Sequence, residues 1–335
     1  MMELNSTFLK KASGFSRFRE LGLVFFIVVI GIIIQTHNRE FLTPTNMSNL
    51  FTNTAILGIL SVGMMVVLLT GGIDLSIGAV IAFSGMVSAL TVKNFPGLHP
   101  AILVLEGAAI GAAVGFVTGT LVSRFSILPI IASLGMMNIM RGLTYVVARG
   151  AWVSAYQMPD SFKRMSTGTF LGINNLIVIA IVVYIVFYFF INYSKTGRRI
   201  YAVGSNREAA DIIGLPSMRI ITLVYVIQGF LAGLGGVLWV SKFASAQGDT
   251  ALGYEMNVIA SCVLGGIAVS GGRGSVPGLL LGVVLFGILA NALPLINVSP
   301  FWQQAIQGFV ILAAIITNVM IKRNHDRSNL RKRFI

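Results

Sequence analysis

The chain has 335 residues, of which 56% are hydrophobic and only 10% are charged, and its formal net charge is +13. A soluble domain carries about 25% charged residues, so this composition excludes one and indicates a membrane protein. The basic residues gather at the ends of apolar runs, so their excess predicts membrane topology and not binding to nucleic acid. Cys262 is the only cysteine, which excludes an internal disulfide.

Uncharged runs recur along the whole chain, and a membrane span needs about 20 apolar residues, or ~17 at the short end. The run lengths predict an all-α polytopic membrane protein with about ten transmembrane helices. The expected spans are 20–37, 48–70, 75–92, 101–122, 126–147, 173–193, 219–240, 253–270, 275–296 and 302–321. Basic tails at 1–19 and 323–335 flank this single membrane domain of residues 20–322.

The distribution of Lys and Arg predicts the orientation. With the N-terminus in the cytoplasm, 17 of the 24 basic residues fall on the inner side and 7 on the outer side or near it. This bias follows the positive-inside rule, so we expect both termini to be cytoplasmic. The longest outer loop, 148–172, carries Trp152, Tyr156, Pro159 and Phe162, and it either packs on the outer surface or contacts a partner.

One acid interrupts a long apolar stretch. Asp74 follows 33 uncharged residues and precedes 18 more. A carboxylate at the centre of a lipid-facing helix costs roughly 2.5–3.5 kcal/mol, so it must face protein, water or the interface. The surrounding glycines predict a broken helix near Gly71–Gly78, at the inner end of the second span. We expect this break to act as a gate or hinge, together with Arg273 in a second glycine-rich loop. The residues of the break with this expected role are Gly71, Gly72, Asp74, Ser76 and Gly78.

The longest inner loop, 194–218, predicts a short amphipathic helix. Ser205 or Asn206 is a suitable N-cap, and Glu208 stands in the first turn, where the helix dipole favours an acid. Gly214 and Pro216 end the helix in the usual order. Either this helix lies in a groove of a soluble partner, or it is a surface helix without one.

Four motifs in order resemble one family. The Glu208-Ala209-Ala210-x3-Gly214 arrangement resembles the coupling loop of membrane subunits of ABC importers. Residues 70–78, 253–276 and 298–304 resemble signatures of the ribose-type monosaccharide permeases, and the likeness covers roughly residues 20–322. One departure is Asn257, where the family usually has Asp, so an essential acidic role is not expected there.

This resemblance implies an assembly of several proteins in a bacterial inner membrane. Two permease subunits, identical or different, form the channel within the lipid, two cytoplasmic ABC ATPase domains hydrolyse ATP with Mg²⁺, and a periplasmic or lipid-anchored protein delivers the sugar. The chain lacks a Gly-x4-Gly-Lys-Ser/Thr phosphate loop, so we expect no nucleotide site, cofactor, metal site or enzyme activity of its own.

The resemblance implies a role for one group of residues, and residue type and position predict roles for two more. The expected ATPase-coupling residues are Gly204, Asn206, Arg207, Glu208, Ala209, Ala210 and Gly214. Residues expected along the sugar path are polar or aromatic and lie in or near spans: Asn53, Asn138, Asn291, Trp302 and Gln303. Residues expected to dock the sugar-binding protein are Lys242, Asp249 and Glu255.

Two other functions compete with the ATP-driven sugar importer. An autonomous facilitator or an ion-coupled transporter is the first, but ion coupling usually needs intramembrane carboxylates, and only Asp74 and Glu106 are candidates. A membrane enzyme is the second, and it is not favoured because the chain lacks the clustered ionisable residues that catalysis would need. The sequence leaves open whether the sugar is ribose, another pentose, a hexose, a deoxyhexose or autoinducer-2.

Overall fold

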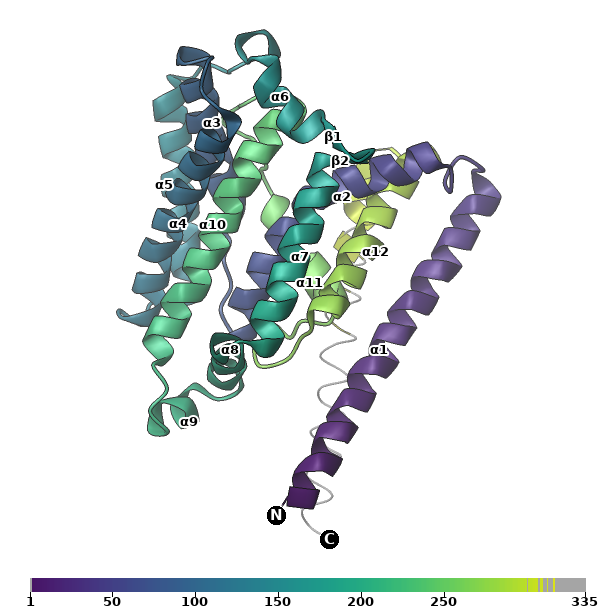
Figure 1. The fold of residues 1–335 in the computed structure, drawn as a ribbon, viewed down its shortest axis with the longest axis vertical. Helices are drawn as coiled ribbons and strands as arrows, with labels where there is room; N and C mark the ends of the chain where they lie inside the picture. Colours follow the sequence, from purple (N-terminus) through teal and green to yellow (C-terminus); the bar gives the residue numbers. More distant parts are fainter. Residues whose placement is uncertain (1, 300, 307, 310–311, 313–315, 317–335) are drawn as a thin grey trace.

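The computed structural model describes residues 2–299, 301–306, 308–309, 312 and 316, with side chains from residue 20 onward. It is a bundle of helices with one short β-hairpin, whose two strands have two residues each (Figure 1). The helices of the first half are α1 (Met2–His37), α2 (Pro44–Leu69), α3 (Ile77–Asn94), α4 (Pro100–Ser123), α5 (Pro129–Ala148), the 3-10 turn η1 (Ala155–Gln157) and α6 (Asp160–Thr167). The hairpin strands β1 (Thr169–Phe170) and β2 (Ile173–Asn174) precede α7 (Asn175–Tyr193), α8 (Lys195–Ser205), α9 (Arg207–Ile212), α10 (Ser217–Phe243), α11 (Tyr254–Leu264) and α12 (Val276–Leu295).

Eight helices in the described part of the chain are long and apolar enough to cross a membrane. They are the Glu20–His37 part of α1, together with α2, α3, α4, α5, α7, α10 and α12. Each agrees with a predicted span to within a few residues. The tenth predicted span, 302–321, lies mostly outside the described residues, and the basic tail 323–335 lies wholly outside them.

The predicted span at 253–270 is wrong. Only Tyr254–Leu264 is helical, and eleven residues reach about 16 Å at 1.5 Å each, against a hydrocarbon core of about 30 Å. The helix stops because Gly265 and Gly266 follow it, and Gly266 has a left-handed φ of 75°. The chain thus enters α11 from a series of turns, forms a short helix and continues as a loop to α12.

Helices α4 and α10 pack closely along their glycines. A Cβ at Gly111 of α4 would meet the backbone of Gly229 and Gly233 of α10, and the reverse also holds. Small residues let helix backbones come together inside a membrane, where no hydrophobic effect drives association. The glycines at 229 and 233 therefore allow the backbones of α4 and α10 to pack directly against each other.

The loop between α5 and α7 packs on the end of α10. Phe162 of α6 is fully buried, and the Ser241 hydroxyl of α10 donates to its carbonyl at 2.7 Å. Val153 forms a β-bridge with Ala246 in the segment that follows α10. Trp152 and Tyr156 remain exposed. The loop therefore covers this end of the bundle and presents two aromatic side chains beyond it.

Candidate functional site

The short helix expected in the loop 194–218 is present as α9, preceded by α8. The Asn206 side chain accepts a hydrogen bond from the Ala209 N–H at 2.9 Å, which confirms the N-cap. Glu208 stands in the first turn. Gly214 ends the helix with a left-handed φ of 78°, and the Leu215 N–H bonds the Ala210 carbonyl at 2.9 Å. Local capping therefore fixes both ends of this six-residue helix.

Helix α9 has an inward and an outward side. Ala210 is buried, whereas Ile212 and Ile213 are 85% and 72% exposed. In Figure 1, α8 and α9 protrude from the same end of the bundle at which α1 begins, and we call this the α9 end. Two large apolar side chains at the tip of a protruding helix provide a surface for a partner protein, and Arg198 and Arg199 of α8 are exposed as well.

Helix α8 packs against both glycine-rich breaks. A Cβ at Gly204 would collide with the Leu69 carbonyl at the end of α2 and with the Gly272 N–H of the loop before α12. Those two groups are hydrogen-bonded to each other at 2.9 Å. Gly272 has a φ of 72°, a left-handed conformation that favours glycine. We call this three-way contact of Gly204, Leu69 and Gly272 the junction.

Two further contacts tie the junction to its neighbours. The Tyr201 hydroxyl donates to the Gly274 carbonyl at 2.9 Å, and burial raises the pKa of this phenol above its ordinary value. The Ser275 hydroxyl donates to Glu20 at 2.7 Å, which places the start of the first span at the same end. The Arg273 side chain is exposed beside them.

The Asp74 segment runs into the bundle and does not stay at its end. The Ile73 carbonyl accepts a hydrogen bond from the Tyr225 hydroxyl at 3.0 Å. Tyr225 lies eight residues after the start of α10, or about 12 Å deeper at 1.5 Å per residue. Asp74 lies in the break between α2 and α3 and is only 3% exposed, so its carboxylate faces protein.

The Asp74 carboxylate serves the start of α3. Its Oδ1 accepts from the Ser76 N–H at 2.8 Å and from the Ser76 hydroxyl at 2.6 Å. Gly78 then lies against the Ala251 carbonyl and Glu255, where a Cβ would collide with both. The carboxylate therefore orders the break between α2 and α3 by holding the residue that precedes α3. Asp74 is also apart from exposed Arg273 and from the cavity described next.

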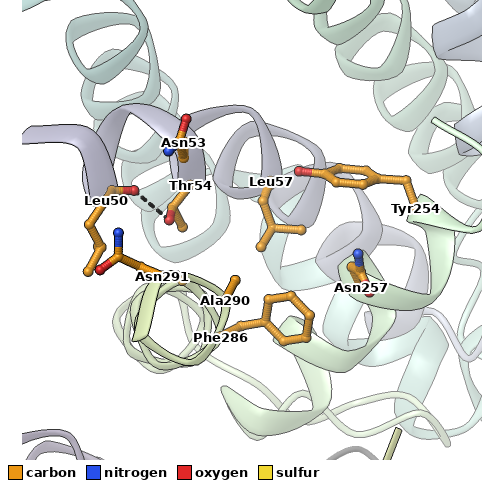
Figure 2. A pocket seen from close by; sticks show the side chains of 10 residues that line it. Leu50, Asn53, Thr54, Leu57, Tyr254, Asn257, Phe286, Ala290 and Asn291 are labelled. Carbon is orange, nitrogen blue, oxygen red and sulfur yellow. Dashed lines mark hydrogen bonds between the residues drawn. The ribbon is translucent and has the colours of Figure 1, made fainter. Parts of the chain in front are cut away.

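A cavity of about 190 Å³ opens between α2, α11 and α12 (Figure 2). Its lining combines amides, hydroxyls, two aromatic rings and aliphatic groups: Leu50, Asn53, Thr54, Leu57, Tyr254, Asn257, Phe286, Gly287, Ala290 and Asn291. Two residues expected along the sugar path, Asn53 and Asn291, thus lie at one cavity. The cavity is near the end of the bundle opposite the α9 end, because Asn291 is four residues from the end of α12 and Asn53 is near the start of α2.

The other expected path residues lie elsewhere. Asn138 is exposed on α5, and its amide donates to the Leu134 carbonyl one turn earlier. Trp302 is 68% exposed, and the Gln303 side chain donates to the Val298 carbonyl at 2.7 Å. None of the three lines the cavity.

The expected docking residues also separate. Asp249 is exposed, in the segment that Arg141 holds by donating to the carbonyls of Gly248 and Thr250. Lys242 is half-buried and donates to Asn53 at 2.8 Å, so it serves the cavity wall. Glu255 is 8% exposed, and this burial does not fit a docking role.

Sequence reasoning missed the contribution of α11 to the cavity. Tyr254 and Asn257 are three residues apart, so both face the same side of the short helix. That spacing is visible in the sequence, but the convergence with Phe286 of α12 is not. Within the described part of the chain, no three His, Cys, Asp or Glu side chains gather as a set of metal ligands.

These features together define a class of protein. Broken helices, a polar cavity near one end of a membrane bundle and a protruding capped helix at the other are typical of a membrane transport subunit that works with a soluble partner. The comparisons with known proteins agree with this class. Residues 46–315 match the family described as "Branched-chain amino acid transport system / permease component".

Individual relatives match over nearly the whole chain. An L-arabinose ABC transporter permease protein of Azospirillum brasilense is 35% identical, covering 92% of this chain and 89% of the relative. The ribose import permease protein of Bacillus subtilis is 36% identical, covering 88% and 90%. The L-arabinose transport system permease protein of Escherichia coli K12 is 31% identical, covering 92% and 93%. No solved structure matches. The chain belongs to this family of transport-system permease components.

Proposed function

We propose that this chain is the channel-forming subunit of an ATP-driven importer of a monosaccharide. The junction is the observation that carries the proposal, because it joins a surface for a soluble partner to the helices of the cavity. The relatives that transport ribose or L-arabinose support a single sugar as the substrate. Nothing in the geometry favours an autonomous facilitator.

The junction offers a direct mechanical path to the cavity. Helix α2 carries Asn53 at the cavity and ends at Leu69 in the junction, about 24 Å away at 1.5 Å per residue. Helix α12 begins just after Gly272 and carries Asn291. A displacement of α8 by a partner therefore moves both helices at one end, and alternating access of the cavity follows from their rocking.

The remaining parts of the assembly belong to the same proposal. The α9 end faces the cytoplasm of a bacterial cell and contacts an ABC ATPase, which binds ATP and Mg²⁺. A second permease subunit completes the channel in the lipid. A periplasmic or lipid-anchored sugar-binding protein docks at the opposite end, near exposed Trp152, Tyr156 and Asp249.

The coupling role is tested by reversing the charge of the first-turn acid of α9. Glu208→Arg places a cation at the positive end of the helix and changes the surface offered to the ATPase. We expect ATP-driven uptake of radiolabelled ribose or L-arabinose to fall at least twentyfold, with normal membrane insertion. The measurement is uptake by proteoliposomes containing the chain, its ATPase and its sugar-binding protein.

Glu40→Arg is the matched control, because Glu40 is an exposed acid in the turn between α1 and α2, far from α9. We expect uptake by this variant to stay within twofold of the unaltered chain. Normal uptake by Glu208→Arg would contradict the coupling role. Uptake by the unaltered chain without ATPase or ATP would replace the importer with a facilitator.

A further inference from the structure

The hydrogen-bonding capacity of the cavity follows from the partners already engaged. Lys242 can only donate, and its Nζ lies 2.8 Å from Asn53 Oδ1 and 3.4 Å from the Thr52 carbonyl. This cation therefore fixes the amide orientation and leaves the Asn53 NH₂ group as the free donor. The Thr54 hydroxyl donates to the Leu50 carbonyl at 2.7 Å, which leaves its oxygen as an acceptor.

The opposite wall adds further amide groups. Asn291 and Asn46 form a reciprocal pair, with N–O distances of 3.0 and 3.2 Å, which fixes the Asn291 side chain. Asn257 of α11 differs, because its amide has no hydrogen-bond partner within the described part of the chain. Figure 2 shows Asn257 and Asn291 on different helices beside this space, with the Asn53 side chain directed away from both.

The lining carries no charged side chain, and this selects the chemistry of a ligand. Carboxylates and phosphates are bound best by cations, and ammonium groups by carboxylates. Interleaved neutral donors and acceptors match hydroxyl groups, because a hydroxyl both donates and accepts. The Phe286 ring and Leu57 provide apolar surface for the C–H groups of a sugar ring.

The volume of the cavity favours a small ligand. At about 190 Å³ it is below the ≈300 Å³ at which pockets for drug-sized molecules begin. A single sugar ring is therefore the expected size, and a disaccharide is not.

We propose that this cavity is a subsite for one uncharged monosaccharide on its path through the chain, and that Asn257 is its ligand-contacting amide. The assignment rests on the proposed import function. The assignment also gives a role to Asn257, the position at which this sequence departs from the usual pattern of the ribose-type permeases. Either an amide or a carboxylate there accepts hydrogen bonds from sugar hydroxyls.

Substitution of Asn257 tests this subsite in the complete transporter. We expect Asn257→Ala to lower the initial rate of ATP-driven ribose or L-arabinose uptake at least tenfold. Stimulation of ATPase activity by the loaded binding protein should stay within twofold, because the junction is intact. Asn257→Asp should keep uptake within threefold, since the carboxylate restores the acceptor. Asn192→Ala, an exposed amide on α7, is the matched control and should leave uptake unchanged.

Cysteine labelling gives a second readout that does not need transport. Cys262 is fully buried, so a water-soluble maleimide reports on Ala290→Cys in the cavity wall. We expect millimolar ribose or L-arabinose to slow its labelling at least threefold, and to leave Ala151→Cys in an exposed loop unaffected.

The results separate the two proposals. Uptake by Asn257→Ala within twofold of the unaltered chain would overturn the subsite, whatever the labelling shows. Failure of the unaltered chain to take up either sugar with ATP would instead overturn the proposed function.

Discussion

The junction and the cavity lie at opposite ends of α2 and α12, and they are held together in different ways. In the junction, backbone meets backbone: Gly204 lies against the Leu69 carbonyl, which bonds the Gly272 N–H. In the cavity, flexible side chains converge, and Asn257 has no partner among the described residues. A backbone contact transmits displacement because it cannot relax by changing a rotamer, whereas a side-chain lining adapts to a ligand. The difference predicts that the junction tolerates far less change than the cavity.

Gly204→Ala should have the largest effect, because the new Cβ collides with two backbone groups that cannot move independently. We expect ATP-driven sugar uptake to be abolished and the thermal stability of the purified chain to fall, by an overpacking cost of about 1–3 kcal/mol. Thermal unfolding and proteoliposome uptake measure the two effects. Gly97→Ala, where a Cβ has open space, is the control. If Gly204→Ala took up sugar as fast as this control, the backbone at the junction would have to shift to accommodate the new Cβ, and the predicted rigidity of the junction would be wrong.

Lys242→Met should have an intermediate effect on the cavity. The change removes the cation that orients Asn53 and leaves the amide free to rotate. Hydrogen bonds to charged groups contribute about 1.5–3 kcal/mol, and partial exposure of Lys242 reduces this. We expect uptake to fall about fivefold with unchanged ATPase stimulation. If Lys242→Met instead lost the stimulation of ATPase activity, a change at the cavity would affect coupling, and the contrast between the cavity and the junction would be wrong.

Tyr201→Phe should have the smallest effect, because it leaves the backbone contact in place and removes only the hydroxyl bonded to the Gly274 carbonyl. The expected cost is about 0.5–1.5 kcal/mol in the free energy of unfolding. We expect a two- to threefold loss of coupling, measured as sugar transported per ATP hydrolysed. A loss of coupling as large as that of Gly204→Ala would show that the Tyr201 hydroxyl, and not the backbone contact, transmits the displacement.

The sequence predicts helix α9 better than the cavity, for a physical reason. Asn206, Gly214 and Pro216 act on their own neighbours, so capping rules locate α9. Hydropathy locates eight spans because composition alone decides partition into lipid. The same measure misjudged 253–270, since an apolar average does not register the stop at Gly265–Gly266.

The cavity depends on tertiary packing that no local rule contains. Asn53 and Asn291 were expected along a sugar path simply as polar residues in apolar spans. Asn138 has the same sequence character, yet it lies exposed on α5. Which amides share a cavity is decided by the rotation of α2, α11 and α12 about their axes. Glu255 illustrates the same limit, because only packing against Gly78 shows that it is buried.

The break after α2 has a consequence for how the chain is made. Lipid offers no hydrogen bonds, so the exposed carbonyls of a broken helix need partners from the protein. Leu69 finds its partner in Gly272, and Ile73 finds its partner in Tyr225, both synthesised long after α2 and α3. A nascent chain that ends before these residues cannot complete its own first break. Completion of this break therefore requires residues from the last third of the protein.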